Sequence, residues 1–299
     1  MQIAATENTI YTSPDASKIF CYTPSILVTP TGRLIVSFDL GGEGVKSIEG
    51  HKSSRAGGSR FGQGKIFISD DNGQKWTFVQ NFPFWHARLF TIGNSIYLIG
   101  HAGDICIMKS EDNGESWSDT YFLTHGEKWH SSACNVLFSN GNVYLAMEQR
   151  CRLNEVTGWD VAGLSPTLFR ACVEDNLCLA SSWSRSEKFI YKEVFDGAKL
   201  DFFGIPFYDC ETNKPKEIAT GINNAPLGWL EANVVKFVDK DHIWHTDLKE
   251  VFHLFLRAHT GGVNYAHLFK IEIQDDQSMI PSLEHTPSGQ KISYIPFPG

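Results

Sequence analysis

The sequence predicts an all-β fold, a β-propeller of four-stranded antiparallel blades, and three observations lead to this prediction. One turn motif occurs twice, starting at Ser69 and at Ser110, and this spacing of 41 residues suits one four-stranded blade. Pairs of short apolar strands joined by glycine-containing turns recur along the chain. Helical periodicity is absent almost everywhere, so the strands carry the fold.

The repeated turn motif has the pattern S-x-D-x-G-x-x-W. We expect the aspartates to accept backbone N–H bonds across the turn, and the glycines to supply a positive φ angle. The tryptophan would then pack the turn against its blade. The structural residues of the two copies are Ser69, Asp71, Gly73 and Trp76, and Ser110, Asp112, Gly114 and Trp117.

The hairpin pattern divides the chain into four units, which start near Tyr22, Trp85, Trp129 and Trp229. Residues 181–224 break the repeat and are rich in Phe, Tyr and Lys. A long insertion between blades commonly forms a wall over the central pocket, and it could equally be a docking surface. We therefore expect one propeller domain over residues 1–299 with an insertion at about 181–224.

The end of the chain bears on how the propeller closes. An open blade leaves unpaired strand edges, so a propeller has to close. After Ile280 the sequence offers only one more short strand. The chain therefore either closes with few blades or is short at its C-terminus compared with its relatives.

Composition excludes several classes of protein. With 42% hydrophobic residues the chain can bury a large core, which excludes disorder. A net charge of -8 without any basic run argues against nucleic-acid binding. No apolar stretch approaches the roughly 20 residues of a membrane span, so none is expected. No signal peptide is present as written, so the chain is cytoplasmic or begins after a removed leader.

The seven cysteines favour buried free thiols over a disulfide framework, because they are odd in number and widely spaced. No C-x-x-C pair occurs, and the pair His242 and His245 lacks metal-ligand spacing on a clear face. We therefore expect no metal and no cofactor.

Several segments resemble the sialidase superfamily, also called BNR-repeat proteins. The two turn motifs resemble its Asp-boxes, and residues 22–34 resemble its opening strand. Residues 228–235 are similar to the strand that carries the glutamate partnering the nucleophilic tyrosine. Residues 254–260 are similar to the strand that supplies an arginine to the substrate carboxylate. The resemblance implies a propeller that acts on glycans, with the Asp-boxes on its rim.

The chain also departs from the sialidase pattern. Tyr22 and His259 stand where two of the family's arginines would be, and Arg257 lies two residues earlier on the same strand face. Residues 41–64, which correspond to the loop of the catalytic aspartate, contain no aspartate. Two short sequence motifs, at residues 129–132 and 229–233, more closely resemble those of sialidase-like proteins of polysaccharide-degrading bacteria. That group includes rhamnosidases and lyases acting on uronate-containing glycans.

A glycosidase usually needs two carboxylates, one as acid and one as base or nucleophile. Glu231 and Glu148 form the best pair, because each lies at a strand end among apolar residues. Burial there would suit a general acid. The alternative is that each carboxylate only bonds a neighbouring arginine, as Glu148 could with Arg150.

A lyase instead needs a base that removes the proton next to a uronate carboxylate, and cations that bind this carboxylate. His130 is the leading base, with Tyr22 or His259 as the acid. The other histidines are read as structural. The residues expected to bind substrate are Arg88, Arg170, Arg257, Trp129, Trp229 and Asn233, although the arginines could form internal salt bridges and the tryptophans could pack in the core.

Three functions follow from these residues, all with a glycan as partner. The first is a glycoside hydrolase acting on a terminal acidic or deoxy sugar. The second is a polysaccharide lyase acting on a uronate glycan. The third is a non-catalytic glycan-binding propeller. The sequence sets neither the sugar nor the oligomeric state.

Overall fold

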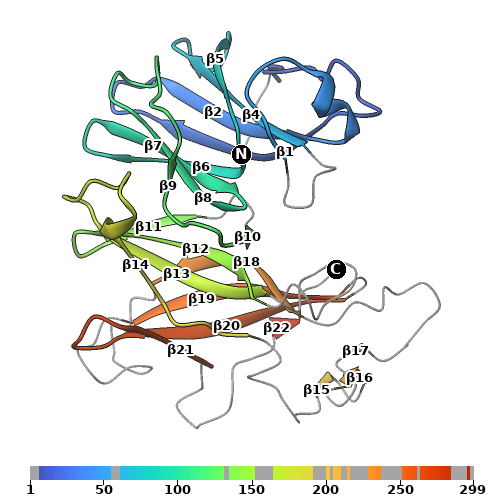
Figure 1. Cartoon of the computed structure of the whole chain (residues 1–299), viewed down its shortest axis with the longest axis vertical. Helices are drawn as coiled ribbons and strands as arrows, with labels where there is room; N and C mark the ends of the chain where they lie inside the picture. Colours follow the sequence, from blue (N-terminus) through green and yellow to red (C-terminus); the bar gives the residue numbers. More distant parts are fainter. Residues whose placement is uncertain are drawn as a thin grey trace. The chain divides into compact units, whose positions relative to one another are not determined.

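The computed structural model describes residues 7–54, 61–130, 135–151, 164–190, 200–202, 205–209, 214–215, 228–236, 251–260, 263–283 and 295–296. Over these residues the chain consists of antiparallel strands and two short 3-10 turns, η1 (Glu43–Ser47) and η2 (Ala180–Ser182) (Figure 1). No helix within them is long and apolar enough to cross a membrane. The predicted all-β class is therefore confirmed.

The chain divides into two compact units, and the first contains residues 1–133 and 176–182. Its first sheet runs β1-β2-β4, with β3 and β5 both paired with β4, and its second sheet runs in chain order. The strands of the first sheet are β1 (Phe20–Val28), β2 (Leu34–Gly41), β3 (Ser53–Ser54), β4 (Phe61–Ser69) and β5 (Thr77–Phe82). Those of the second are β6 (Trp85–Ile92), β7 (Ser95–Ala102), β8 (Asp104–Ser110) and β9 (Tyr121–Phe122). A short strand, β10 (Trp129–His130), ends the unit's first segment.

The second unit contains residues 134–175 and 183–299. Its strands also follow one another in chain order, except that β22 pairs with β20. One sheet contains β11 (Val136–Ser139), β12 (Asn142–Arg150), β13 (Leu164–Cys172) and β14 (Trp183–Arg185). The next contains β18 (Gly228–Val235), β19 (Val251–Thr260), β20 (Val263–Ile273), β21 (Met279–Leu283) and β22 (Ile295–Pro296). A small separate sheet contains β15 (Leu200–Phe202), β16 (Ile205–Asp209) and β17 (Lys214–Pro215).

Each unit has an apolar core between the faces of its large sheets. In the first unit Ile35 and Ile66 of one sheet pack with Leu89 and Leu98 of the other. In the second unit Tyr144 of β12 lies 4.1 Å from Phe252 of β19, measured between ring centroids. Alternate residues of each strand supply these contacts, which is the period-2 pattern that the sequence shows.

Both copies of the repeated motif form the turn that the sequence predicts. Asp71 Oδ1 accepts a hydrogen bond from Lys75 N at 2.8 Å, and Asp112 Oδ1 accepts one from Ser116 N at 2.9 Å. Gly73 has a φ of 81° and Gly114 a φ of 89°. The bond from the Lys75 amide is the main cause that lowers the pKa of Asp71.

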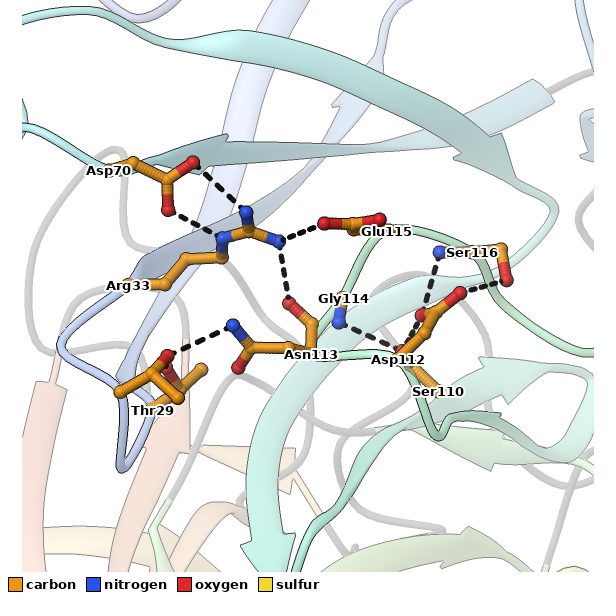
Figure 2. Close-up of polar contacts among 10 residues, drawn as sticks. Thr29, Arg33, Asp70, Ser110, Asp112, Asn113, Gly114, Glu115 and Ser116 are labelled. Atoms are coloured by element: carbon orange, nitrogen blue, oxygen red, sulfur yellow. Dashed lines mark hydrogen bonds and ion pairs between the residues drawn. The ribbon is translucent and has the colours of Figure 1, made fainter.

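Arg33 connects the two turns to the first hairpin (Figure 2). Its guanidinium donates to both carboxylate oxygens of Asp70, at 2.6 and 3.0 Å, and to Glu115 Oε1 at 3.2 Å. It also donates to the carbonyl oxygen of Asn113 at 3.2 Å. The side chain of Arg33 is only 13% exposed. Because its guanidinium bonds residues of both turns, it links the two neighbouring sheets at one end of the first unit.

A short strand lies inside the predicted insertion of residues 181–224. Trp183–Arg185 forms β14 and pairs with β13, so these residues complete the third large sheet. The sequence pattern did not predict this strand, because it contains only three residues and two of them are polar. Of the rest of the predicted insertion, the backbone of β15–β17 and residues 186–190 are described, and the other residues lie outside the described part of the chain.

Candidate functional site

A bulge interrupts the first strand of three large sheets, and it holds one non-glycine residue in a left-handed conformation. The bulges lie between Tyr22 and Ser25 in β1, between Trp85 and Arg88 in β6, and between Leu230 and Asn233 in β18. The left-handed residues are Thr23, His86 and Glu231, with φ angles of 43°, 54° and 60°. Each such residue costs about 1–3 kcal/mol, and both bulges and backbone strain concentrate at functional sites.

The register places a polar residue at one position of the second strand in all four large sheets. Val36, Leu98, Leu145 and Leu254 pair with equivalent residues of the preceding strand. Three residues further along stand Asp39, His101, Glu148 and Arg257. In β2, β7 and β19 this position faces the bulge. The bulge and the residue opposite it therefore form a constellation that is repeated at one end of three first strands, β1, β6 and β18.

In the first unit Asp39 supports two bulges at once. Its carboxylate accepts a hydrogen bond from the Thr23 hydroxyl in its own sheet, and Oδ1 accepts another from His86 N in the next sheet at 3.1 Å. Asp39 is only 1% exposed. A buried carboxylate is stable when backbone and hydroxyl donors surround it, and here these donors come from the distorted strands.

Three histidines of the first unit gather beside this carboxylate. His86 Nδ1 lies 3.0 Å from His101 Nε2, and the ring of His130 lies 5.4 Å from that of His86 and 6.3 Å from that of His101, between centroids. His101 and His130 are buried. One nitrogen of the 3.0 Å pair donates and the other accepts, so the two rings share one proton between them.

In the second unit Glu148 has the role that Asp39 has in the first. Glu148 is fully buried, and its Oε1 accepts a hydrogen bond from Ala232 N at 2.9 Å. Ala232 directly follows Glu231 in the bulge, so the carboxylate of Glu148 fixes the backbone that presents Glu231. Glu231 itself is half-buried. Of the predicted pair of carboxylates, Glu148 thus bonds the backbone next to Glu231.

Polar side chains next to the bulges tie neighbouring sheets together in both units. Ser25 Oγ accepts a hydrogen bond from Leu89 N at 3.0 Å. At the equivalent position Asn135 accepts from Val234 N at 3.0 Å and donates to the Val234 carbonyl at 2.6 Å. Asn233, which the sequence suggested as a substrate ligand, accepts from Asn135 N at 3.2 Å. These bonds hold adjacent first strands in register.

The three predicted arginines have different surroundings. Arg88 is 2% exposed. It directly follows the bulge in β6, so it lies at the same end of this strand as His86. Arg170 pairs with Tyr144 in backbone register, four residues from Glu148 along β12, which is about 13 Å. Its guanidinium donates to Gln277 Oε1 at 3.0 Å, which connects β13 to the turn between β20 and β21. The backbone of Arg257 pairs with Leu230 beside the Glu231 bulge.

The two predicted acids of the lyase mechanism lie at strand ends next to bulges. Tyr22 directly precedes the first bulge and is 48% exposed, with its ring over Gly41 and against Phe20. His259 pairs with Gly228 in backbone register, and its side chain lies outside the described part of the chain.

The two predicted sugar-stacking tryptophans are core residues. Trp129 is 2% exposed, and its Nε1 donates to Glu127 Oε2 at 3.0 Å. Trp229 is fully buried and stacks on Phe189, with ring centroids 5.3 Å apart. Neither indole offers an open face to a sugar, so the packing alternative that the sequence left open describes them both.

Sequence reasoning missed Asp39, His86 and His101. Asp39 lies in β2, two residues before the loop of residues 41–64 in which the resemblance to sialidases places the acid. The two histidines stand on strands whose alternation reads as ordinary core. Only the bulges place these side chains together, and a bulge at a non-glycine residue leaves no mark in the sequence.

Within the described ranges no group of three or more histidine, cysteine or acidic side chains could hold a metal ion. Five cysteines there are free thiols, namely Cys21, Cys106, Cys151, Cys172 and Cys178. Burial raises the pKa of Cys106 to about 12, so its thiol stays protonated and serves as an apolar core group.

Comparisons of the sequence with models of protein families and with curated proteins gave no match. Solved structures do match. The α-L-arabinofuranosidase of Lactobacillus brevis has a TM-score of 0.50 and 12% identity, over 90% of this chain and 80% of that enzyme. A protein of unknown function from Dyadobacter fermentans gives 0.49 and 14%, over 91% and 70%. The α-L-arabinanase of Penicillium chrysogenum gives 0.44 and 11%, over 91% and 69%.

At these identities the likeness establishes the fold, and the β-propeller prediction is confirmed. The matched enzyme of Lactobacillus brevis is an arabinofuranosidase, so this likeness bears on the propeller fold and does not extend to sialidases in particular.

Proposed function

We propose that this chain is a glycoside hydrolase and that Glu231 is a catalytic carboxylate. The observation that supports this most directly is the left-handed bulge at Glu231, whose backbone is fixed by the buried acid Glu148. A carboxylate on a strained backbone that hydrogen bonds hold in place is preorganised before substrate binds. Acid–base catalysis needs such a preorganised group. Glu148 is then a positioning residue, because its carboxylate bonds the bulge.

The sugar is part of the proposal. The sialidase-like segments favour a terminal acidic or deoxy sugar, as the sequence suggests. The fold likeness to an α-L-arabinofuranosidase adds a terminal arabinofuranose to the candidates. A panel of sialylated, rhamnose-capped, arabinofuranose-capped and uronate-containing glycans covers these classes, and new reducing ends report hydrolysis.

The test is the substitution Glu231→Gln on the substrate that the panel identifies. We expect kcat to fall by at least a hundredfold, because the glutamine side chain cannot donate or accept the catalytic proton. The unfolding midpoint should stay within about a degree or two, because glutamine has the same shape as glutamate. Glu272→Gln is a matched control, since Glu272 is a half-buried acid of the same sheet that pairs with Lys270. Full activity of Glu231→Gln would refute the role of Glu231.

A specific observation favours a second candidate, a lyase acting on a uronate glycan. It is the cluster of His86, His101 and His130, whose imidazoles are candidate bases near the buried Arg88. A lyase forms a carbon–carbon double bond at the uronate, so its product absorbs ultraviolet light and each cleavage also makes a reducing end.

Ultraviolet absorbance separates the two candidates in the same incubation. Reducing ends without absorbance would establish a hydrolase, and both signals together would establish a lyase. For a lyase we expect His130→Gln to abolish the absorbance, while the exposed His125→Gln leaves it unchanged. Neither signal from a folded sample would favour a glycan-binding propeller and would overturn both enzymatic candidates.

A further inference from the structure

A cleft of about 520 Å³ lies at the second Asp-box, away from the bulges. It is formed by the end of β8, the Asp-box turn itself, β9, and the segment 176–179 that returns to the first unit. This volume falls within the range of sites for small ligands. None of the residues in the repeated bulge constellation lines it.

The cleft combines apolar surface with polar groups. Trp117 and Tyr121 line it together with Leu179, and Tyr121 and Leu179 are 44% and 51% exposed. Large apolar side chains left open to solvent beside polar rims mark binding surfaces. The ring of an aromatic residue suits the C–H face of a sugar, and its polar tip stays wet.

The two Asp-boxes differ at their tryptophans. In the first copy Trp76 Nε1 donates to the carbonyl oxygen of Gly73 at 3.0 Å, so the turn binds its own indole. In the second copy Trp117 Nε1 is buried and has no acceptor among the described residues. A buried N–H without an acceptor is rare in native proteins, and bound water or ligand is a common reason for it. The second indole thus lines the cleft without being tied to its turn.

The charges of the cleft argue for an uncharged ligand. Lys109 Nζ and Glu111 Oε1 form an ion pair of 2.6 Å, and this bond raises the pKa of Lys109. The carboxylate of Asp112 is used by the turn and adds one negative charge that no cation of the cleft balances. An acidic glycan would meet this charge unfavourably.

The remaining polar group is oriented for hydroxyls. Asn176 Oδ1 accepts a hydrogen bond from Cys178 N at 3.1 Å, which fixes the amide and leaves its NH₂ group as a donor. The Tyr121 hydroxyl can donate or accept. Two aromatic rings, one fixed amide and a neutralised lysine are the chemistry that recognises a neutral sugar chain.

We propose that this cleft is a glycan-binding subsite for short neutral oligosaccharides, distinct from the bulge residues. The inference rests on the proposed glycan activity, since it assigns a second point at which the same polymer is held. Such a subsite raises the residence time of the chain near the active residues by multivalent binding.

Calorimetric titration of the full chain with xylotetraose, cellotetraose and arabinotetraose tests the proposal. All titrations use the Glu231→Gln variant, so that no ligand is consumed. We expect at least one of the three to bind, Tyr121→Ala to weaken its binding at least tenfold, and trigalacturonate to bind at least tenfold more weakly. Phe122→Ala is the matched control, because Phe122 is the neighbouring residue of β9, is 48% exposed and does not line the cleft.

Two further variants keep the test informative if a truncation harms folding. Tyr121→Phe retains the ring and should retain most of the affinity, whereas Asn176→Asp exchanges the donor for a charge and should weaken binding. Absence of binding by all three neutral probes, or an equal effect of Phe122→Ala and Tyr121→Ala, would overturn the subsite. Binding without any turnover by the unsubstituted chain would uphold the subsite while refuting the proposed hydrolase.

Discussion

The two units use the same backbone device to present different side chains. In the first unit Asp39 accepts the amide of His86, and in the second Glu148 accepts the amide of Ala232, next to Glu231. In both cases a buried acid of one sheet fixes a bulge in the first strand of the following sheet. The supporting acid is therefore part of the scaffold. The bulge residue is a histidine in one unit and a glutamate in the other, and the proposed function assigns the chemistry to these residues.

Removing the supporting acids tests this comparison most strongly. Asp39→Ala leaves the His86 amide and the Thr23 hydroxyl without this acceptor, and Glu148→Ala does the same to the Ala232 amide. We expect losses in the free energy of unfolding of about 3 and about 2 kcal/mol, because a buried unsatisfied donor costs roughly 1–3 kcal/mol. Urea unfolding of the full chain measures them.

The amide variants are the matched controls for these acids. Asp39→Asn and Glu148→Gln keep a carbonyl oxygen at the acceptor position, so we expect losses below about 1 kcal/mol. If the alanine variants prove as stable as the amide variants, the acids do not hold the bulges.

The same residues show which parts of the fold and of the candidate site can be predicted from the sequence. The order of the sheets follows from local signals, since the hairpins and the two Asp-boxes each lie within one stretch of chain. Glu231, Glu148 and His130 were found because each lies in a recognisable step or among apolar neighbours. Asp39 and His101 were missed because their partners are set by strand pairing across the bulges. Burial of Trp129 and Trp229 depends on the neighbouring sheet, which the sequence does not display.

The two units also differ in the side-chain hydrogen bonds that join the first strands of neighbouring sheets. Asn135 makes two side-chain hydrogen bonds to Val234, whereas Ser25 accepts one from Leu89. We expect Asn135→Ala to cost about 2 kcal/mol and Ser25→Ala about 1 kcal/mol in unfolding free energy. Asn142→Ala, which removes one exposed bond within a hairpin turn, should change it little. Equal losses for all three would contradict the comparison.

Glycine substitutions measure the backbone strain at the bulges directly. At His86 and Glu231 the positive φ penalises any side chain, so His86→Gly and Glu231→Gly should be more stable than the corresponding alanine variants by about 1 kcal/mol. At Thr91, an ordinary position of β6, the order should reverse, because glycine in a strand costs roughly 0.5–1 kcal/mol relative to alanine. Thermal unfolding gives both rankings, and alanine variants more stable than the glycine variants at His86 and Glu231 would show that the bulges store no strain.

Cys21 reports the charge of Asp39, and this is the smallest effect that we predict. Partial burial and the Asp39 carboxylate raise the pKa of Cys21, while Lys65 lowers it. Asp39→Asn removes the negative charge, so the thiolate forms at lower pH and alkylation of Cys21 at pH 8 becomes faster. Lys65→Met removes the positive charge and should slow the same reaction. Peptide-resolved mass spectrometry after iodoacetamide treatment separates Cys21 from the other cysteines. An unchanged rate in Asp39→Asn would mean that the Asp39 carboxylate does not raise the pKa of Cys21.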